Sequence, residues 1–374
     1  MEYALSELFT LQMGKTPSRD NSSYWKKSEN NWISIADLTN SGKYISNTKE
    51  TLSDSAVAES GIKKIPANTV IMSFKLSLGK VAITEKEMYS NEAIMAFIDK
   101  GVEKISPEYL YYLLRAKDWS KGTNKAVMGA TLNKATLSTI KIQLHEYDNQ
   151  LEIVNMLNRV SSSIDFRKQQ LTKLDELIKA RFVEMFGNAE TTSQAQTKRL
   201  EECCISISGG NTPSMQHPEY YGGKIPFIKS GDVKSDHISV SSLTLTQIAL
   251  NETTVKMLPK GTLIVVIRSA ALLKEFRIGI LDVDAVINQD LKALQTSDDV
   301  LPVYLMWAIK MKSQVLLSRV QTMLTSHIRM EDLLDLKVQI PHLSLQNQFA
   351  NFVAEINKSK LLAEVFAQST CILA

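Results

Sequence analysis

The chain has 374 residues, of which 44% are hydrophobic and 22% are charged, a composition that is typical of a folded globular protein and excludes a disordered or fibrous one. Its formal net charge of +3 is too small to indicate a nucleic-acid partner by itself. No apolar run approaches the ~18 residues of a membrane span, and the amino terminus MEYALSELFTLQMGK lacks the pattern of a secretory leader, so we expect a cytoplasmic protein without membrane contact.

Residues 1–145 predict a first mixed α/β unit. They begin with a glycine-containing loop, QMGKTPSRDNSSYW, followed by short apolar runs that Pro, Gly and Asn turns separate. Such runs predict short strands. The segment PEYLYYLLRAKDW from Pro107 has the spacing of an amphipathic helix, and KIQL from Lys141 predicts one more strand.

Residues 146–190 predict a long helical arm. Its apolar residues recur at alternating steps of four and three, the 3.5-residue period of a helix that supercoils with a partner. No Gly or Pro interrupts the pattern before Gly187, which is well placed to end the helix. The apolar seam comprises Ile153, Leu157, Val160, Ile164, Leu171, Leu174, Ile178 and Met185, and Arg167 and Arg181 occupy two further positions of the same pattern.

Residues 191–342 repeat the first unit. The phrase GKTPS returns as GNTPS, and across eight such blocks the offset between the copies stays between 193 and 200 residues. An offset that varies this little over the whole chain identifies a tandem duplication. Equivalent pairs include Gly14 and Gly210, Gly79 and Gly279, Asn91 and Asn288, Pro107 and Pro302, Lys141 and Lys337, and Gln150 and Gln346.

Residues 343–374 predict a second helical arm with a weaker pattern, Phe349, Val353 and Ile356 being its clearest apolar positions. The last residues, KLLAEVFAQSTCILA, are mostly small and apolar, whereas the equivalent part of the first arm is charged. We therefore expect either a shorter arm or a truncated or altered end. Because the chain must return, the two arms can lie antiparallel and hold the two units at opposite ends of a rod. Packing of the arms on partner chains is the other interpretation, and the two are compatible.

Motifs of catalysis are missing from the sequence. It has no phosphate-binding loop, no His-Glu-x-x-His, no Cys-x-x-Cys and no Asn/Asp-Pro-Pro-aromatic motif of amino-methyltransferases. The five histidines do not recur with an acid and a nucleophile at duplicated positions, and the three cysteines form neither a disulfide framework nor a metal-ligand pattern. We predict no catalytic residue and no metal site on this chain.

The duplicated phrases resemble the specificity subunit of type I restriction-modification enzymes. The likeness rests on G-x-T-P-S followed by Tyr-Trp or Tyr-Tyr, on the later Asn-Glu and Asn-Gln, on the Pro-x-Tyr-Leu helix start, and on the Gln-led arm with KQQLTKLDELIKARFVEMFG. It covers essentially the whole chain. The resemblance implies an α+β fold with two tandem-duplicated α/β target-recognition domains joined by long antiparallel coiled-coil-like helices.

The same resemblance implies the function and the partners. Each target-recognition domain would read one half of a bipartite asymmetric site in double-stranded DNA, while the helices set the gap and dock methyltransferase (modification) subunits. S-adenosylmethionine would be bound by those subunits, and ATP and Mg2+ by motor-nuclease (restriction) subunits, so this chain would need no cofactor. The alternative is a non-catalytic protein-interaction scaffold with two related binding modules. A self-sufficient nuclease or methyltransferase conflicts with the missing motifs.

Candidates for DNA contact are the polar positions at which the two copies differ. Residues of a shared framework should be the same in both copies, whereas residues that determine which DNA sequence is bound should differ. Base edges are read by Arg, Lys, Asn, Gln or Asp, and phosphates are bound by Lys, Arg, Ser and Thr. In the first unit the candidates are Lys15, Arg19, Asn21, Lys26, Lys75, Thr131, Asn133 and Lys134. In the second they are Asn211, Gln216, His217, Lys229, Lys234, Arg268, Ser269, Ser326, His327 and Arg329.

Overall fold

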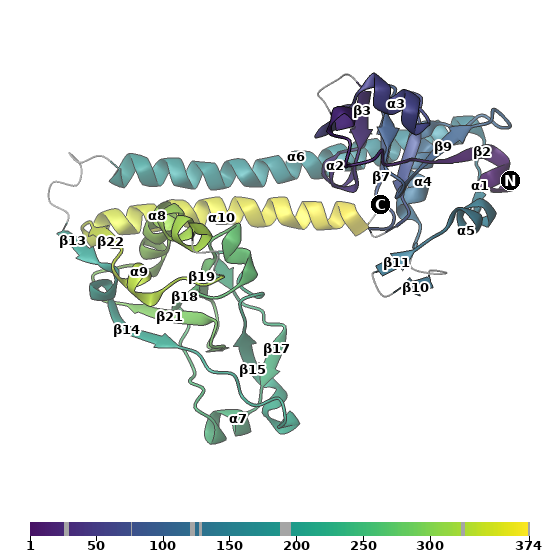
Figure 1. Ribbon diagram of the computed structural model, residues 1–374. Helices are drawn as coiled ribbons and strands as arrows, with labels where there is room; N and C mark the ends of the chain where they lie inside the picture. Colours follow the sequence, from purple (N-terminus) through teal and green to yellow (C-terminus); the bar gives the residue numbers. More distant parts are fainter. Residues whose placement is uncertain are drawn as a thin grey trace. The chain divides into compact units, whose positions relative to one another are not determined.

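A computed structural model of the chain describes residues 1–25, 30–75, 77–119, 124–126, 129–187, 196–322 and 326–372. The chain forms two compact units, Met1–Ser163 and Ile164–Leu373. Figure 1 labels their strands and helices. Each unit is built on sheets, and one long helix, α6 (Tyr147–Phe186), begins in the first unit and ends in the second. The predicted mixed α/β fold with two sheet-based units and a long helix is confirmed.

The described part of the first unit contains a five-stranded and a three-stranded sheet. The larger has the order β2-β9-β6-β7-β4, with β2 (Phe9–Met13), β9 (Ile94–Asp99), β6 (Val70–Ser73), β7 (Val81–Thr84) and β4 (Tyr44–Ile45). The smaller has the order β5-β3-β8, with β5 (Glu50–Leu52), β3 (Asn30–Ile33) and β8 (Tyr89–Ser90). Two strand pairs accompany them, β1 (Glu2–Ala4) with β12 (Lys141–Gln143), and β10 (Asn124–Ala126) with β11 (Gly129–Thr131).

The sheets of the second unit repeat this topology within its described residues. The larger sheet has the order β14-β21-β18-β19-β16, with β14 (Cys204–Gly209), β21 (Leu291–Thr296), β18 (Leu263–Val266), β19 (Ile278–Leu281) and β16 (His237–Ile238). The smaller has the order β17-β15-β20, with β17 (Leu243–Leu245), β15 (Tyr221–Ile228) and β20 (Val286–Ile287). Strand β13 (Gln196–Arg199) pairs with β22 (Lys337–Ile340) as β1 pairs with β12.

Helices connect and cover the sheets. In the first unit they are α1 (Leu5–Leu8), α2 (Ile35–Asn40), α3 (Asp54–Ser60), α4 (Pro107–Ala116) and α5 (Lys134–Thr139), with the 3-10 helix η1 (Ser22–Trp25). In the second they are α7 (Gln247–Glu252), α8 (Pro302–Thr322), α9 (Met330–Leu334) and α10 (Leu343–Ile372), with η2 (Leu200–Cys203), η3 (Pro218–Tyr220) and η4 (Ala270–Leu273).

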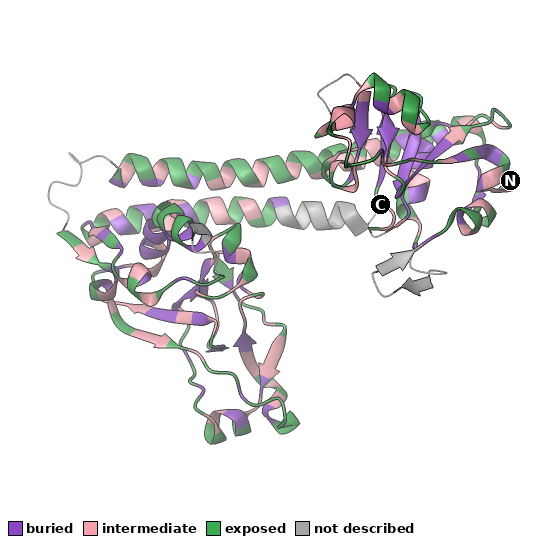
Figure 2. Cartoon of the chain, viewed as in Figure 1, coloured by how far each residue is buried: buried purple, intermediate pink, exposed green. Residues whose placement is uncertain are grey.

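The central strands are buried on both faces, as Figure 2 shows for the purple segments of each sheet. Successive side chains of a strand point to opposite faces. Val70 and Met72 of β6 therefore join one hydrophobic cluster while Ile71, between them, joins another. Because both faces carry a core, these strands read as continuous apolar runs rather than as an alternation.

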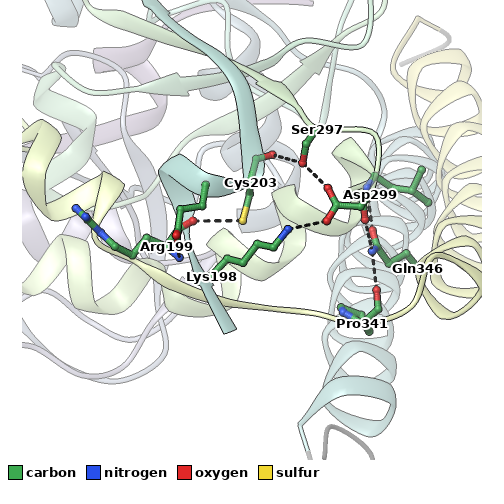
Figure 3. Close-up of polar contacts among 9 residues, drawn as sticks. Lys198, Arg199, Cys203, Ser297, Asp299, Pro341 and Gln346 are labelled. Atoms are coloured by element: carbon green, nitrogen blue, oxygen red, sulfur yellow. Dashed lines mark hydrogen bonds and ion pairs between the residues drawn. The ribbon is translucent and has the colours of Figure 1, made fainter. Parts of the chain in front are cut away.

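A buried glutamine ties the second unit to the first turn of α10 (Figure 3). The side chain of Gln346 is fully buried, and its Oε1 accepts a hydrogen bond of 2.8 Å from the main-chain N–H of Leu301. Its Nε2 donates to the carbonyl oxygens of Asp299 at 2.9 Å and Pro341 at 2.8 Å. The amide therefore joins the residues before α8 to the residues before α10.

Gln150 makes the same three contacts in the first unit. It is fully buried, accepts a hydrogen bond of 3.0 Å from the N–H of Ser106, and donates to the carbonyl oxygens of Lys104 at 3.1 Å and His145 at 2.9 Å. Each partner lies 195 or 196 residues before its counterpart in the second unit. We call these two arrangements the glutamine clamps.

Within the second unit, the end of α6 runs antiparallel to α10. Asp175 pairs with Lys360, whereas Phe182, further along α6, meets Phe349 at the beginning of α10 with ring centroids 5.3 Å apart. Helix α6 ends at Phe186, directly before the predicted stop at Gly187. Ile178 of the predicted seam is buried, and the others, Ile153, Leu157, Val160, Ile164, Leu171, Leu174 and Met185, are half-buried.

Replacing Gln346 by leucine should lower the free energy of unfolding by roughly 2–4 kcal/mol, because the N–H of Leu301 and the carbonyl groups of Asp299 and Pro341 lose their partner. Gln348→Leu on the same helix is the matched control, since Gln348 is exposed, and should change stability by less than about 0.5 kcal/mol. Urea unfolding followed by circular dichroism measures both. Equal stability of the two variants would contradict the structural role of the clamp.

Candidate nucleic-acid interface

One edge of each large sheet gathers loops from distant parts of the chain. Strands β2 and β6 both run antiparallel to β9, which lies between them, so their carboxyl ends meet the amino end of β9. Strands β14, β18 and β21 repeat this arrangement. We call these places the loop edges. The first comprises residues 14–16, 74–75, 91–93 and 132–133, and the second residues 210–212, 267–269, 288–290 and 326–329.

The repeated glycine of G-x-T-P-S lets the loop lie against the neighbouring strand. A Cβ on Gly14 would overlap the carbonyl oxygens of Ser90 and Asn91, and one on Gly210 would overlap those of Ile287 and Asn288. Neither glycine has a positive φ, so the requirement is close approach of main chains rather than an unusual conformation.

The repeated threonine holds the loop by its side chain. The hydroxyl of Thr16 donates to the Glu92 carboxylate, and that of Thr212 donates to the Gln289 side-chain oxygen. These partners are the second residues of the duplicated Asn-Glu and Asn-Gln. The G-x-T-P-S motif therefore occurs twice because it builds the same framework at both loop edges.

Four predicted DNA-contact residues lie together at the second loop edge. The N–H of Ser269 donates to the carbonyl oxygen of Ser326 at 2.9 Å, and Arg268 forms a β-bridge with His327. The Arg268 side chain is 62% exposed, and its Nη1 lies 3.9 Å from Oδ1 of Asp290. A guanidinium is thus presented to solvent beside a carboxylate.

The first loop edge brings Lys75 and Asn133 to equivalent places. The N–H of Leu132 donates to the carbonyl oxygen of Phe74 at 3.0 Å, as the N–H of Ile328 donates to that of Ile267 at 2.8 Å. Lys75 follows Phe74 as Arg268 follows Ile267.

Two of these first-unit candidates also have local roles. Asn133 caps α5, because its Oδ1 accepts a hydrogen bond of 2.7 Å from the N–H of Thr136. Lys134 is exposed in the first turn of that helix. The side chain of Thr131 and the whole of Lys26 lie outside the described residues.

Arg19 is held by partners within its own unit. Its guanidinium makes two hydrogen bonds to the Glu50 carboxylate, at 2.6 and 3.0 Å, and lies 3.6 Å from the centroid of the Trp25 ring. The hydrogen bond to Glu50 raises the pKa of Arg19, and the same bond lowers the pKa of Glu50.

Three other candidates, in the loops that follow Gly14 and Gly210, also contact residues of their own unit. Lys15 Nζ donates to the carbonyl oxygen of Ser60 at 2.5 Å, and Asn21 Oδ1 accepts a hydrogen bond of 3.1 Å from the N–H of Ser23. The Nδ2 of Asn211 donates to Thr254 Oγ1 at 3.0 Å.

The remaining candidates of the second unit lie in several places. His217 stacks on Tyr220 with ring centroids 5.0 Å apart and pairs with Glu219 at 2.8 Å, beside the exposed Gln216. Arg329 precedes α9 and bonds to Asp332 at 3.0 Å. Lys229 is half-buried, whereas Lys234 lines a cavity of about 600 Å³ together with residues of α6 and α10.

Asp290 is a residue of the second loop edge that the sequence analysis missed. Its carbonyl oxygen accepts hydrogen bonds from the N–H groups of Ile267, at 2.9 Å, and Arg268, at 3.2 Å. The first copy has Ala93 at the equivalent place, and Ala93 likewise accepts from Phe74 at 3.0 Å. Because Asp290 is polar and its equivalent in the first copy is an alanine, it meets the criterion of a polar position at which the copies differ.

Among the described residues, no group of three His, Cys, Asp or Glu side chains is placed to hold a metal ion. Burial raises the pKa of the Cys203 thiol to about 11 and that of Cys204 to about 12, so both are protonated at neutral pH. No described helix has the length and apolarity to cross a membrane.

Comparison with known proteins gives one family. The family model for the type I restriction modification DNA specificity domain matches residues 1–176 and 192–365. The chain is 28% identical over 288 residues to the type I restriction enzyme MjaIX specificity subunit of Methanocaldococcus jannaschii, a match that covers 71% of this chain and 65% of that subunit. It is 29% identical over 189 residues to the HindI specificity subunit of Haemophilus influenzae, covering 48% of this chain and 40% of that subunit. The matches thus span less than two thirds of these relatives.

Solved structures show the same fold. The crystal structure of the S subunit of a type I restriction-modification system from M. genitalium aligns with a TM-score of 0.55 and 12% identity, covering 100% of this chain and 93% of that one. A chain from a study of complex assembly and conformational transition of the type I system aligns with a TM-score of 0.58 and 16% identity, covering 100% and 95%.

Gly210→Ala should destabilise the protein by roughly 1–3 kcal/mol, because the added methyl group has to displace main-chain atoms. Gly231→Ala is the matched control in the same unit, since a Cβ there meets no atom within 4 Å. Thermal unfolding of both variants tests this expectation. If the Gly210 variant unfolds at the same temperature as the control, the close approach is not what the repeated glycine provides.

Proposed function

This chain belongs to the family of type I restriction-modification DNA specificity domains, and we propose that it is the sequence-specificity subunit of a type I restriction-modification complex. Each unit reads one half of a bipartite asymmetric DNA site. The long helices set the gap between the halves and dock methyltransferase subunits. The functional boundaries of this proposal are residues 1–145 and 191–342 for the two recognition domains, and 146–190 and 343–374 for the arms.

The proposal rests on one observation: the two loop edges share a framework but carry different side chains at equivalent positions. At both loop edges the glycine and threonine make equivalent contacts. The side chains at the tip differ, because Lys75 stands where the other copy has Arg268, and Ala93 where it has Asp290. Two related surfaces with unlike polar groups suit a protein that reads two unlike DNA sequences.

The chemistry of the second loop edge suits base recognition. An arginine reads guanine through O6 and N7 in the major groove, and an aspartate accepts from the amino group of cytosine. Arg268 is exposed and lies beside Asp290, which would orient the guanidinium. At the first loop edge Lys75 can bind a guanine or a phosphate as a compact charge. The two units would thus read different bases with the same loop.

Apolar side chains on the arms support docking of partner subunits. On the part of α6 that belongs to the second unit, Phe166 is 63% exposed, Leu177 46% and Val183 48%. On α10, Leu361 and Leu362 are exposed as well. Exposed apolar side chains on these helices are available to a docked subunit.

We assign the chemistry of the complex to other chains. The methyltransferase subunits would bind S-adenosylmethionine, and motor-nuclease subunits would bind ATP and Mg2+. This chain would act in the cytoplasm as a DNA-binding component without a cofactor or a catalytic residue of its own. The sequence supports this division because it lacks the motifs of those reactions.

Arg268→Ala should weaken binding of the reconstituted complex to its target site by ~1–3 kcal/mol and relax one base position in the methylation profile. Lys260→Ala is the control, because Lys260 is exposed and precedes β18 at the end opposite the loop edge. It should leave the profile unchanged. Equal loss on target and random DNA would make Arg268 a phosphate contact. If neither the wild type nor the variants show salt-dependent duplex binding, the protein-interaction scaffold becomes the better account.

A further inference from the structure

The second loop edge contains a buried asparagine whose side chain contacts Asp290. Asn288 is 6% exposed, and its Nδ2 donates a hydrogen bond of 2.9 Å to Oδ2 of Asp290. The main chain of Asn288 is held on both sides. Its N–H donates to the carbonyl oxygen of Ile228 at 3.1 Å, and its carbonyl oxygen accepts from the N–H of Leu291 at 3.2 Å. The amide nitrogen is therefore presented to Asp290 from a fixed main chain.

The equivalent asparagine of the first unit uses its side chain differently. The N–H of Asn91 donates to the carbonyl oxygen of Ile33 at 3.1 Å, and its carbonyl oxygen accepts from the N–H of Ile94 at 3.2 Å. The main chain thus makes the same two contacts in both units. Oδ1 of Asn91, however, accepts a hydrogen bond of 3.0 Å from the N–H of Ala93. Ala93 stands in the place of Asp290 and has no carboxylate to accept from the amide.

The hydrogen bond to Asp290 leaves the amide oxygen of Asn288 unsatisfied. Oδ1 is buried, and no described residue donates a hydrogen bond to it. A buried acceptor without a partner destabilises a folded protein. Turning the amide over would bring Oδ1 against Oδ2 of Asp290, and neither atom can donate. The turn itself does not require this arrangement, because the first unit makes the same main-chain contacts with the oxygen of Asn91 satisfied.

The two carboxylate oxygens of Asp290 face different residues. Oδ2 accepts from Asn288, whereas Oδ1 lies 3.9 Å from Nη1 of Arg268, an ion-pair distance. The side chain of Asp290 is 25% exposed and that of Arg268 is 62% exposed. The guanidinium is thus the group that can reach a base edge, and the carboxylate beside it can orient it.

We propose that Asn288 is a positioning residue for DNA sequence recognition, which holds the Asp290 carboxylate in the orientation that directs the Arg268 guanidinium at a guanine. This inference rests on the proposed function of the chain. A guanidinium that is already oriented loses less conformational entropy when it makes two hydrogen bonds to a guanine. Because the first unit has Ala93 in place of Asp290, we assign this relay of three residues to the second unit alone.

Affinities for a series of DNA duplexes test the proposal. Methylation profiling of the reconstituted complex defines the wild-type target, and fluorescence anisotropy then compares a duplex with that target and duplexes in which each base pair is replaced in turn. Asn288→Ala should lower the discrimination about fivefold at one base pair of one half-site and leave the other positions unchanged. Asn288→Asp, which keeps the size of the side chain but removes the donor, should do the same. Unchanged discrimination in both variants would overturn the proposal.

Pairs of substitutions test the order of the relay. Asp290→Ala should relax the same base pair, whereas Asp298→Ala should not, since Asp298 is exposed, lies beyond the carboxyl end of β21 and removes the same charge. Asn288→Ala should cause no further loss of discrimination in the Asp290→Ala variant. Asp290→Ala should cause none in the Arg268→Ala variant, because each residue acts through the next. Additive losses in either pair contradict the relay, and a loss in Asp298→Ala equal to that in Asp290→Ala does so as well.

Thermal unfolding separates this role from a purely structural one. Asp290→Ala should not lower the unfolding temperature, because Asn288 can then accept from the N–H of residue 290 as Asn91 accepts from Ala93. A structural role predicts a lower unfolding temperature and an equal loss of affinity for every duplex. That result would overturn this inference and leave the proposed function intact. If the wild-type complex binds every duplex equally, both the inference and the proposed function are wrong.

Discussion

A buried glutamine amide at the start of each long helix is the interaction on which the rest of the structure depends. The side chains of Gln150 and Gln346 are fully buried, and each pairs with one N–H and two carbonyl groups of the main chain. An unpaired buried polar group costs roughly 1–3 kcal/mol. Each amide therefore holds in place the three chain segments that supply its hydrogen-bond partners. The clamp makes the beginning of the helix an extension of the globular unit.

The partners of the clamps explain how one framework supports two recognition surfaces. Every hydrogen bond that the two amides make in the described structure goes to main-chain atoms. Main-chain partners do not depend on which side chains the unit carries. The loop edges are therefore free to diverge, as Lys75 and Arg268 have, while the helix still leaves each unit in the same way.

Periodicity and repetition in the sequence predicted the duplication, the mixed α/β units and the long helix ending before Gly187. Contacts between distant residues were not predictable, because a residue's type does not identify its partner. Arg19 stays a predicted DNA contact, but the sequence did not show that it pairs with Glu50, 31 residues away. The repeat identified Gln150 as the equivalent of Gln346, but it did not show that the side chain is fully buried. Asp290 was missed because the sequence does not show that its main chain pairs with Ile267 and Arg268, more than 20 residues earlier.

The most direct measurement of this account exchanges residues 1–145 for the matching segment of a type I specificity subunit with a different target, and profiles the DNA methylation of the reconstituted complex. Gln150 remains outside the exchanged segment and needs only main-chain partners within it. The account predicts that one half of the target changes while the other half and the gap stay the same. A change of both halves, or of the gap, would contradict the independence of the two units.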